Sequence, residues 1–263
     1  MDEPYKDLTD VYKSCFNLKL VSNSKVVTHG TGFLVFMKQR YFLISNYHVF
    51  SGIDPFTKRI DYNIENALIN IKVKNNKYEE VSIPLQRENV ELFKYCESET
   101  QIYDVAAVEI DFEIIEKMAE PYILKIGTHD EEAIRPAENI LVIGFPFGYS
   151  PGSHLPLAKQ GIISSLPQYK MYDDNLPCFL IDSATRGGMS GAPVFIEHRK
   201  PGQLISSGKL YSFLGVYSGR VKLSPIDRDK YSSVQKTGLD DLSSDIGMVW
   251  KPEVLLKVLN LFF

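Results

Sequence analysis

Short segments that are apolar, or that alternate between apolar and polar residues, recur along the whole chain and limit the fold more than any other feature. In 67–74, Ile71 and Val73 lie on one face while Lys72 and Lys74 lie on the other, which is the two-residue period of a half-buried strand. Such segments predict thirteen strands, at 16–22, 33–37, 41–46, 67–74, 79–85, 103–110, 139–145, 159–165, 177–183, 192–197, 203–207, 211–218 and 244–250. Because only brief helical stretches separate them, they favour antiparallel sandwiches or barrels, and we predict a mostly β protein.

Helices are expected at few places. At the C-terminus, Pro252 can occupy a first helical turn, and the apolar residues after it recur at helical spacing, so this helix is expected to pack on the body of the protein. Short helices are expected at 4–14 and 113–119. The charged stretch 87–100 predicts a surface loop or helix ahead of a strand, and the polar stretch 220–243 predicts a long exposed loop.

Composition and net charge limit the classes of function that the chain can have. With 44% of its 263 residues apolar, the chain can bury a substantial core, whereas a net charge of -4 argues against binding to nucleic-acid phosphates. The first twenty residues begin acidic and no run of eighteen apolar residues occurs, so we expect neither a secretory signal nor a membrane segment. Cys15, Cys96 and Cys178 form no C-x-x-C motif, which favours a reducing compartment. We therefore predict a cytoplasmic protein with no nucleic-acid or membrane partner.

One stretch, ATRGGMSGAPVF at 184–195, has the surroundings that a nucleophilic serine needs. Gly187 and Gly188 permit backbone conformations closed to other residues, so the amides of Gly188 and Ser190 can point at one spot and form an oxyanion hole. Gly191 keeps the approach to the serine open. The alternative is an ordinary glycine-rich turn between two strands.

A serine nucleophile requires a base, usually an imidazole that a carboxylate orients. Among the histidines only His48 closes an apolar segment, YFLISNYHVF, where the end of a strand can place it at the edge of a cleft; the alternative is a buried structural histidine. Asp104 begins the expected strand 103–110 beside otherwise buried residues, and Asp111 at the far end of that strand is the rival acid. The other histidines are His29, His129, His154 and His198.

The chain order of these candidates, His48, Asp104 and Ser190, is that of the chymotrypsin triad. An α/β-hydrolase would place the serine first and the histidine last. Only His198 follows Ser190, and it follows too soon to leave room for the acid. The order therefore favours a chymotrypsin-like arrangement.

Several short motifs occur in order along the chain. They are Gly30-Thr31-Gly32-Phe33, Ser45-Asn46-Tyr47-His48-Val49, Tyr103-Asp104-Val105-Ala106, Ile143-Gly144-Phe145-Pro146 with Gly148, Gly161-Ile162-Ile163-Ser164, Asp182, Gly188-Met189-Ser190-Gly191, Ser218-Gly219 and Gly247-Met248-Val249-Trp250. In these motifs the sequence resembles the trypsin-like serine peptidase superfamily, and its HtrA-type bacterial branch more than the disulfide-bonded secreted enzymes. The resemblance covers nearly the whole chain and implies two six-stranded antiparallel β-barrels with a C-terminal helix, in halves 1–120, carrying His48 and Asp104, and 121–263, carrying Ser190.

Departures from the family pattern limit what the resemblance implies. Met189 stands where secreted trypsins have the aspartate that captures a new N-terminus, so activation by that cleavage is not expected. Ala192 replaces the second glycine of G-x-S-G-G-P. We expect no PDZ domain after the closing helix, so recognition of protein tails by such a domain is not implied.

The resemblance also implies a pocket for the substrate side chain before the scissile bond. It places Ala184 and Thr185 at the base, Gly219 and Arg220 along one wall and Gly247 at the back, with Ser218-Gly219 on the strand that pairs with the substrate backbone. No acid stands at the base, so cleavage after Lys or Arg should be poor. Small or medium apolar residues are expected, or an acidic residue if Arg220 turns inward.

The sequence thus predicts an intracellular serine endopeptidase that acts on proteins or peptides through an acyl-enzyme intermediate. Ser190 is the expected nucleophile, His48 the base, Asp104 the orienting acid, and Gly188 and Ser190 the oxyanion donors, with no cofactor or metal required. The alternative is a pseudo-protease that uses the same fold to bind a partner protein. A third hypothesis is a viral-type or self-processing protease; any activating partner is unknown.

Overall fold

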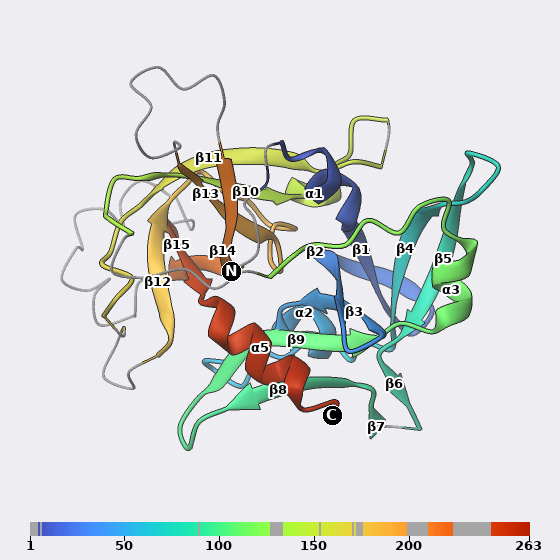
Figure 1. Ribbon diagram of the computed structural model, residues 1–263. Coiled ribbons are helices and arrows are strands. Elements are labelled where there is room, and N and C mark those ends of the chain that lie inside the picture. The colour runs from blue at the N-terminus through green and yellow to red at the C-terminus, as the bar shows by residue number, and fades with distance from the viewer. Residues whose placement is uncertain are drawn as a thin grey trace, which may run out of the picture.

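The computed structural model describes residues 5, 7–88, 90–126, 134–152, 154–169, 171, 176–198, 210–222 and 243–263. About half of them lie in strands and far fewer in helices, which confirms the predicted mostly β fold (Figure 1). The strands are β1 (Cys15–Ser22), β2 (Lys25–Met37), β3 (Arg40–Ser45), β4 (Asn66–Lys72), β5 (Tyr78–Pro84), β6 (Gln86–Arg87), β7 (Val90–Glu91), β8 (Phe93–Glu97), β9 (Ile102–Glu109), β10 (Asn139–Gly144), β11 (Leu157–Ile163), β12 (Cys178–Asp182), β13 (Pro193–His198), β14 (Leu210–Lys222) and β15 (Ser243–Trp250).

The strands form two main sheets, one before residue 120 and one after it. The second is the predicted closed six-stranded barrel, in the order β10-β11-β12-β15-β14-β13. The first is a seven-stranded sheet in the order β5-β4-β1-β2-β3-β9-β8, where six strands in a barrel were expected. All the strand pairs in both sheets are antiparallel.

The extra strand of the first sheet corrects the prediction of a loop or helix over 87–100. Within this stretch β8 pairs with β9, with Phe93 opposite Val108, and β7 pairs with β6. Phe93 is 5% exposed and packs in the core of the first sheet, and Leu92 and Tyr95 pack against the same core, so apolar residues anchor a stretch that is rich in charge. The expected strand 203–207 and residues 223–242 of the expected loop lie outside the described residues; 220–222 and 243 belong to β14 and β15.

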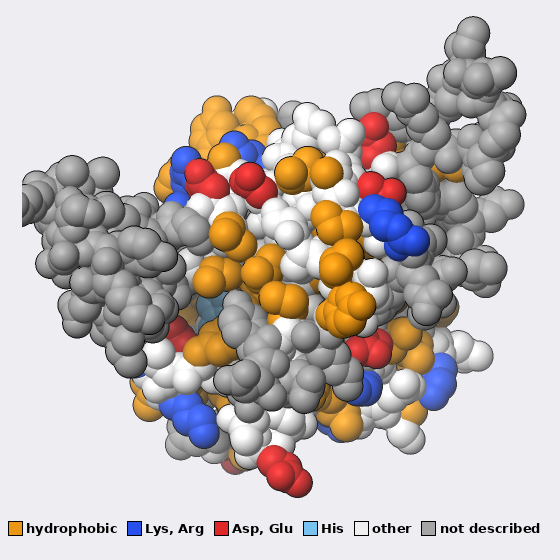
Figure 2. All heavy atoms as spheres, turned by 90° about the vertical axis from the view of Figure 1, so that its left-hand side faces the viewer, with side chains coloured by type: hydrophobic (Ala, Val, Ile, Leu, Met, Phe, Trp, Pro, Cys, Tyr) orange, Lys and Arg blue, Asp and Glu red, His pale blue; other side chains and the backbone are white. Residues whose placement is uncertain are grey.

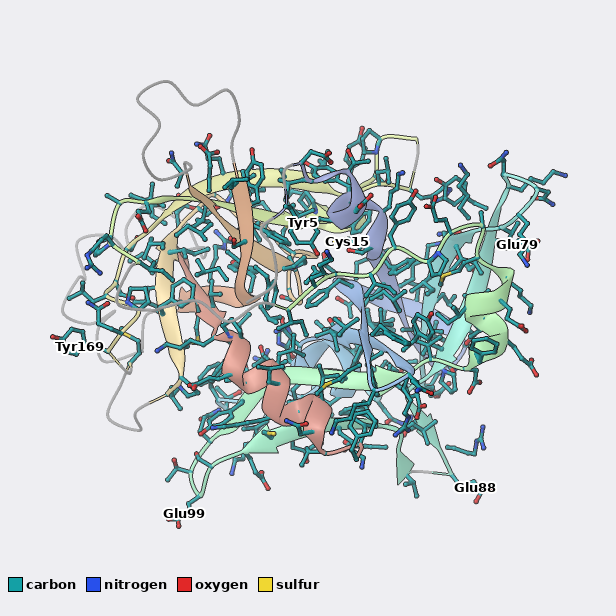
Figure 3. The ribbon with its side chains drawn as sticks, viewed as in Figure 1. Tyr5, Cys15, Glu79, Glu88, Glu99 and Tyr169 are labelled. Carbon is teal, nitrogen blue, oxygen red and sulfur yellow. The ribbon has the colours of Figure 1, made fainter. Side chains whose placement is uncertain are left out.

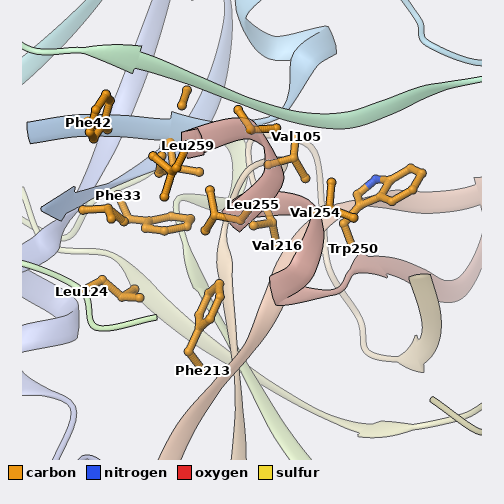
Figure 4. Packing of buried hydrophobic residues seen from close by; sticks show 14 of the residues in the cluster. Phe33, Phe42, Val105, Leu124, Phe213, Val216, Trp250, Val254, Leu255 and Leu259 are labelled. Atoms are coloured by element: carbon orange, nitrogen blue, oxygen red, sulfur yellow. The ribbon is translucent and has the colours of Figure 1, made fainter. Parts of the chain in front are cut away.

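The helices are short, and the last one joins the two halves. They are α1 (Thr9–Ser14), α2 (Tyr47–Ser51), α3 (Phe112–Lys117), the 3-10 turn η2 (Pro146–Gly148) and α5 (Pro252–Asn260). The apolar face of α5, with Val254, Leu255 and Leu259, packs in one cluster with residues of both sheets, including Phe33 and Phe213 (Figure 4). Burial of this face therefore holds the two sheets together.

The outside of the barrel also carries apolar side chains. Figure 2 shows hydrophobic side chains gathered across the middle of the face that includes β12 and β15. Ile162 on β11 and Ile246 on β15 are exposed. No helix among the described residues is long and apolar enough to cross a membrane.

All three cysteines are free thiols, and two of them are buried. Cys15 lies where α1 meets β1 (Figure 3), and Cys178 begins β12. Burial penalises the thiolate and raises the pKa of each of these two thiols from 9.0 to about 12. The folded protein therefore keeps protons on these thiols at a pH where the unfolded chain releases them.

We expect the free energy of unfolding to fall as the pH rises from about 9 toward 12, because the unfolded state then binds fewer protons than the folded one. The midpoint of urea unfolding should be lower at about pH 10.5 than at about pH 8. The variant with both Cys15→Ala and Cys178→Ala removes this contribution, so its midpoint should depend less on pH. Equal pH dependence in the two proteins would contradict the assignment.

Candidate active site

Asp104 lies on β9 and is 1% exposed, yet its carboxylate has three hydrogen-bond partners. Oδ1 accepts from the backbone N–H of His48 at 3.0 Å, and Oδ2 lies 2.8 Å from Nδ1 of His48. Oδ2 also accepts from Oγ of Ser218 at 2.5 Å. Buried carboxylates are costly unless they are satisfied in this way. Because an ionised carboxylate only accepts, Nδ1 carries the proton and the neutral imidazole has its acceptor lone pair on Nε2.

His48 does not end a strand, which corrects the prediction from the sequence. β3 ends at Ser45, and His48 is the second residue of α2. Asn46 precedes the helix in extended conformation and donates from Nδ2 to the backbone oxygen of Asp104 at 2.6 Å. Gly52 ends α2 with φ 72°. The helix therefore fixes the ring beside Asp104, and the His48 side chain is 32% exposed.

The turn that carries Ser190 depends on two glycines with positive φ. Gly188 has φ 89° and Gly191 has φ 85°. A Cβ would lie 2.4 Å from the backbone oxygen of Phe145 at Gly188, and 2.2 Å from that of Thr31 at Gly191. Any other residue at these two positions would need a strained left-handed backbone and would bring its Cβ against a backbone oxygen atom. The sequence pattern around Ser190 thus reflects a tightly packed turn against the first sheet.

Hydrogen bonds fix the peptide groups around Ser190. Gly187 O accepts from Phe147 N at 2.6 Å, and Met189 O accepts from Ala192 N at 3.0 Å. These carbonyls belong to the same peptide groups as the N–H groups of Gly188 and Ser190. Neither of those N–H groups has a hydrogen-bond acceptor among the residues that the structure describes. Both amides are therefore positioned and available to a ligand.

Thr31, on β2, connects this turn to the first sheet. Its N–H donates to Ser190 O at 2.8 Å, and its buried Oγ1 donates to Gly188 O at 2.8 Å while accepting from Phe145 N at 3.0 Å. Its own carbonyl accepts from Oγ of Ser45, at the end of β3, at 2.7 Å. One buried residue thus links the serine turn to the strand end that leads to His48.

The structure brings the three predicted catalytic residues to one region. A Cβ placed on Gly30 would lie 2.6 Å from Cγ1 of Val49, next to His48, and 3.6 Å from the backbone oxygen of Ser190. α2 and the serine turn therefore both border β2. Ser190 and His48, both described, share no hydrogen bond in this structure. Catalytic hydrogen bonds are often long before substrate binds and tighten in the complex.

The rival residues lie elsewhere or outside the described part. Asp111 is exposed at the start of α3. Nδ1 of His29 lies 3.3 Å from Oδ1 of Asn17, and the ring of His154 packs on Tyr78 with 4.4 Å between centroids. His129 and the side chain of His198 lie outside the described residues. No cluster of metal-ligating side chains occurs within the described ranges.

The predicted pocket residues lie on β14, β15 and the segment before Ser190. Thr185 is buried, Ala184 is exposed, and Arg220 on β14 pairs with Gly247 on β15. Sequence reasoning missed Tyr217, which is 2% exposed and whose hydroxyl lies 2.5 Å from Oγ1 of Thr185. It lies in the expected strand 211–218, directly before Ser218, and nothing in the local pattern distinguishes it from the other residues of that strand.

Residues 30–205 match the family described as the trypsin-like peptidase domain, which is more than half of the chain. The chain belongs to this family. The predicted resemblance is therefore confirmed. His48, Asp104 and Ser190 all lie inside the matched range of this trypsin-like peptidase, whereas Ser218, Gly219, Arg220 and Gly247 follow it.

Solved structures agree in fold. The HtrA-type protease AlgW with a tripeptide is 15% identical, with a TM-score of 0.55, and the match covers 97% of this chain and 62% of that one. A serine-to-alanine variant of AlgW with a tripeptide gives 14% identity, the same TM-score, and coverage of 96% and 61%. The chain thus spans about three fifths of the length of these proteins. No curated protein matches the sequence.

Proposed function

We propose that this trypsin-like peptidase is a serine endopeptidase in which Ser190, His48 and Asp104 act as a catalytic triad. The observation that carries the proposal is the buried Asp104 carboxylate, which binds the Nδ1 side of His48 at 2.8 Å and the backbone N–H of the same residue at 3.0 Å. This pair of contacts fixes the ring's orientation and its tautomer. A histidine with only a structural role would not need both of these contacts with the Asp104 carboxylate.

The reaction proposed here has two stages. Oγ of Ser190 attacks the carbonyl carbon of a peptide bond while Nε2 of His48 takes the hydroxyl proton. The N–H groups of Gly188 and Ser190 stabilise the negative oxygen of the tetrahedral intermediate. The C–N bond then breaks, and His48 returns the proton to the leaving amine. Water attacks the acyl-enzyme by the same route and releases the acid and free Ser190.

An intracellular, cytoplasmic location is part of the proposal. It is supported by Cys15, Cys96 and Cys178, which are all free thiols and too few to staple a secreted domain of this length. A reducing compartment would keep them in that state. Proteins or peptides of that compartment would then be the substrates.

A fluorophosphonate probe tests the triad directly. Ser190 should displace fluoride from the probe, and mass spectrometry should locate the adduct on Ser190, because only an activated serine reacts quickly. Ser190→Ala should not be labelled, whereas Ser82→Ala, which changes an exposed serine on β5, should be labelled normally.

Two results would overturn the proposal. An adduct on another serine would show that the nucleophile is misassigned. A folded protein without any labelling would favour the alternative, in which the same fold binds a partner protein without cleaving it.

A further inference from the structure

Tyr217, on β14 of the barrel, is tied to the serine turn by two backbone hydrogen bonds. Its carbonyl accepts from Gly191 N at 2.9 Å, and its N–H donates to Ala192 O at 2.9 Å. The next residue, Ser218, binds Asp104. Tyr217 is therefore joined through its backbone to the turn that carries Ser190, and its neighbour Ser218 is joined to Asp104.

Two glycines near Tyr217 have free space beside them within the part of the chain that the structure describes. A Cβ added at Gly187, before the serine, would meet no atom of the described residues within 4 Å, and the same holds at Gly219 on β14. These two positions belong to the segments that flank Ser190, so a peptide can approach along either of them. The depth available to a substrate side chain then depends on which side chains are buried beside Ser190 and these two segments.

The ring of Tyr217 lies beside two of the predicted pocket residues, Gly247 and Thr185. A Cβ added at Gly247 on β15 would lie only 2.6 Å from Cε2 of that ring. The hydroxyl of Tyr217 is 2.5 Å from Oγ1 of the buried Thr185. The ring thus extends from Gly247 to Thr185 and fills the space that these two residues border.

We propose that Tyr217 is the specificity-determining residue, and that it limits the residue before the scissile bond to Gly, Ala or Ser. The inference rests on the proposed endopeptidase function and names its substrate class. A larger side chain would have to displace the ring, which is 2% exposed in a packed core. Displacement would also separate two buried hydroxyls that satisfy each other, and unsatisfied buried hydroxyls are costly.

Charge around the ring does not favour a long cationic side chain either. Nη1 of Arg186 donates to Thr185 O at 2.7 Å and lies 3.5 Å from Oδ1 of Asp245. Asp245, whose charge acts on Tyr217, is therefore already paired with an arginine. Lys or Arg in the substrate would lose hydration and meet positive charge.

The test uses two peptidyl diphenyl phosphonates that differ only in the residue before phosphorus, alanine or phenylalanine. Ser190 displaces phenoxide from such a probe, so the rate of labelling measures how well that residue fits. The unaltered protein should react with the alanine probe about a hundredfold faster than with the phenylalanine probe. Tyr217→Val should remove most of this difference by accelerating the phenylalanine probe. Tyr217→Phe keeps the ring and should keep the preference.

The outcomes separate this inference from the function on which it rests. If neither phosphonate nor the fluorophosphonate labels Ser190 in folded protein, the endopeptidase proposal fails. If the fluorophosphonate labels Ser190 and the phenylalanine probe reacts as fast as the alanine probe, only the role of Tyr217 is refuted. A third probe ending in glutamate that reacts fastest would also refute it, and would assign specificity to Arg220. If Tyr217→Val does not fold, the two rates in the unaltered protein still decide the question.

Discussion

Asp104→Asn is expected to lower kcat by about four orders of magnitude while leaving the fold intact. The substitution keeps the size of the side chain but leaves it one acceptor oxygen and adds an N–H2 donor. In the protein, the carboxylate accepts from the backbone N–H of His48 and from Ser218, and it binds Nδ1 of His48. An amide that turns its nitrogen toward Nδ1 forces the proton onto Nε2. The imidazole can then no longer accept the proton of Ser190.

The matched control for this experiment is Asp111→Asn. Asp111 is the acid that the sequence offered as a rival, and it is exposed at the start of α3. Steady-state hydrolysis of a peptide ester ending in alanine should be near normal in the control and slow in Asp104→Asn, with similar urea midpoints for both. Near-normal turnover by Asp104→Asn would remove Asp104 from the site.

The sequence predicted the parts of the fold that depend on local pattern. Alternation of apolar and polar residues located β4 at Asn66–Lys72, and helical spacing located α5 at Pro252–Asn260. Where the pattern was weak, prediction failed. β8 was missed because the charged residues of 87–100 mask its few apolar ones, such as Phe93 and Tyr95, whereas pairing with β9 and packing in the core stabilise the strand.

The position of His48 shows a second kind of error. The apolar run from Tyr41 to Phe50 suggested one strand, but Asn46 and Gly52 bracket a short helix instead. Those two residues are ordinary signals for a helix start and a helix end, so the sequence does carry a local signal for α2. In the folded protein α2 holds the ring of His48 against Asp104. No local sequence signal predicts this contact, because Asp104 is 56 residues away from His48.

Contacts between the two sheets were the least predictable part of the site. Ser218 reaches Asp104 across 114 residues, and Thr31 reaches Gly188 across 157. Each contact exists only when both sheets are folded and packed through α5. The contact between the hydroxyls of Tyr217 and Thr185 depends in the same way on the closed barrel. Sequence pattern can place such residues in a core, but only the packed structure shows which residues they contact.

His48→Ala is expected to lower kcat by about six orders of magnitude, and its combination with Asp104→Asn should be no slower than His48→Ala alone. In the proposed mechanism Asp104 acts only through the ring of His48, so it has nothing to orient once the ring is gone. Independent roles would instead give losses that multiply, to about ten orders in total. Residual activity in His48→Ala would come from the Gly188 and Ser190 amides, which this substitution does not touch.

Single-turnover hydrolysis of an alanine ester by the two single variants and the double variant measures this coupling. Urea unfolding of each variant checks that the fold survives, because the buried Asp104 carboxylate loses a partner when the ring is removed while it still accepts from Ser218 and the backbone N–H of residue 48. Equal rates in His48→Ala and the double variant are the expected result. A double variant far slower than His48→Ala would mean that Asp104 acts on the reaction by a route other than the imidazole, and the triad as drawn would be wrong.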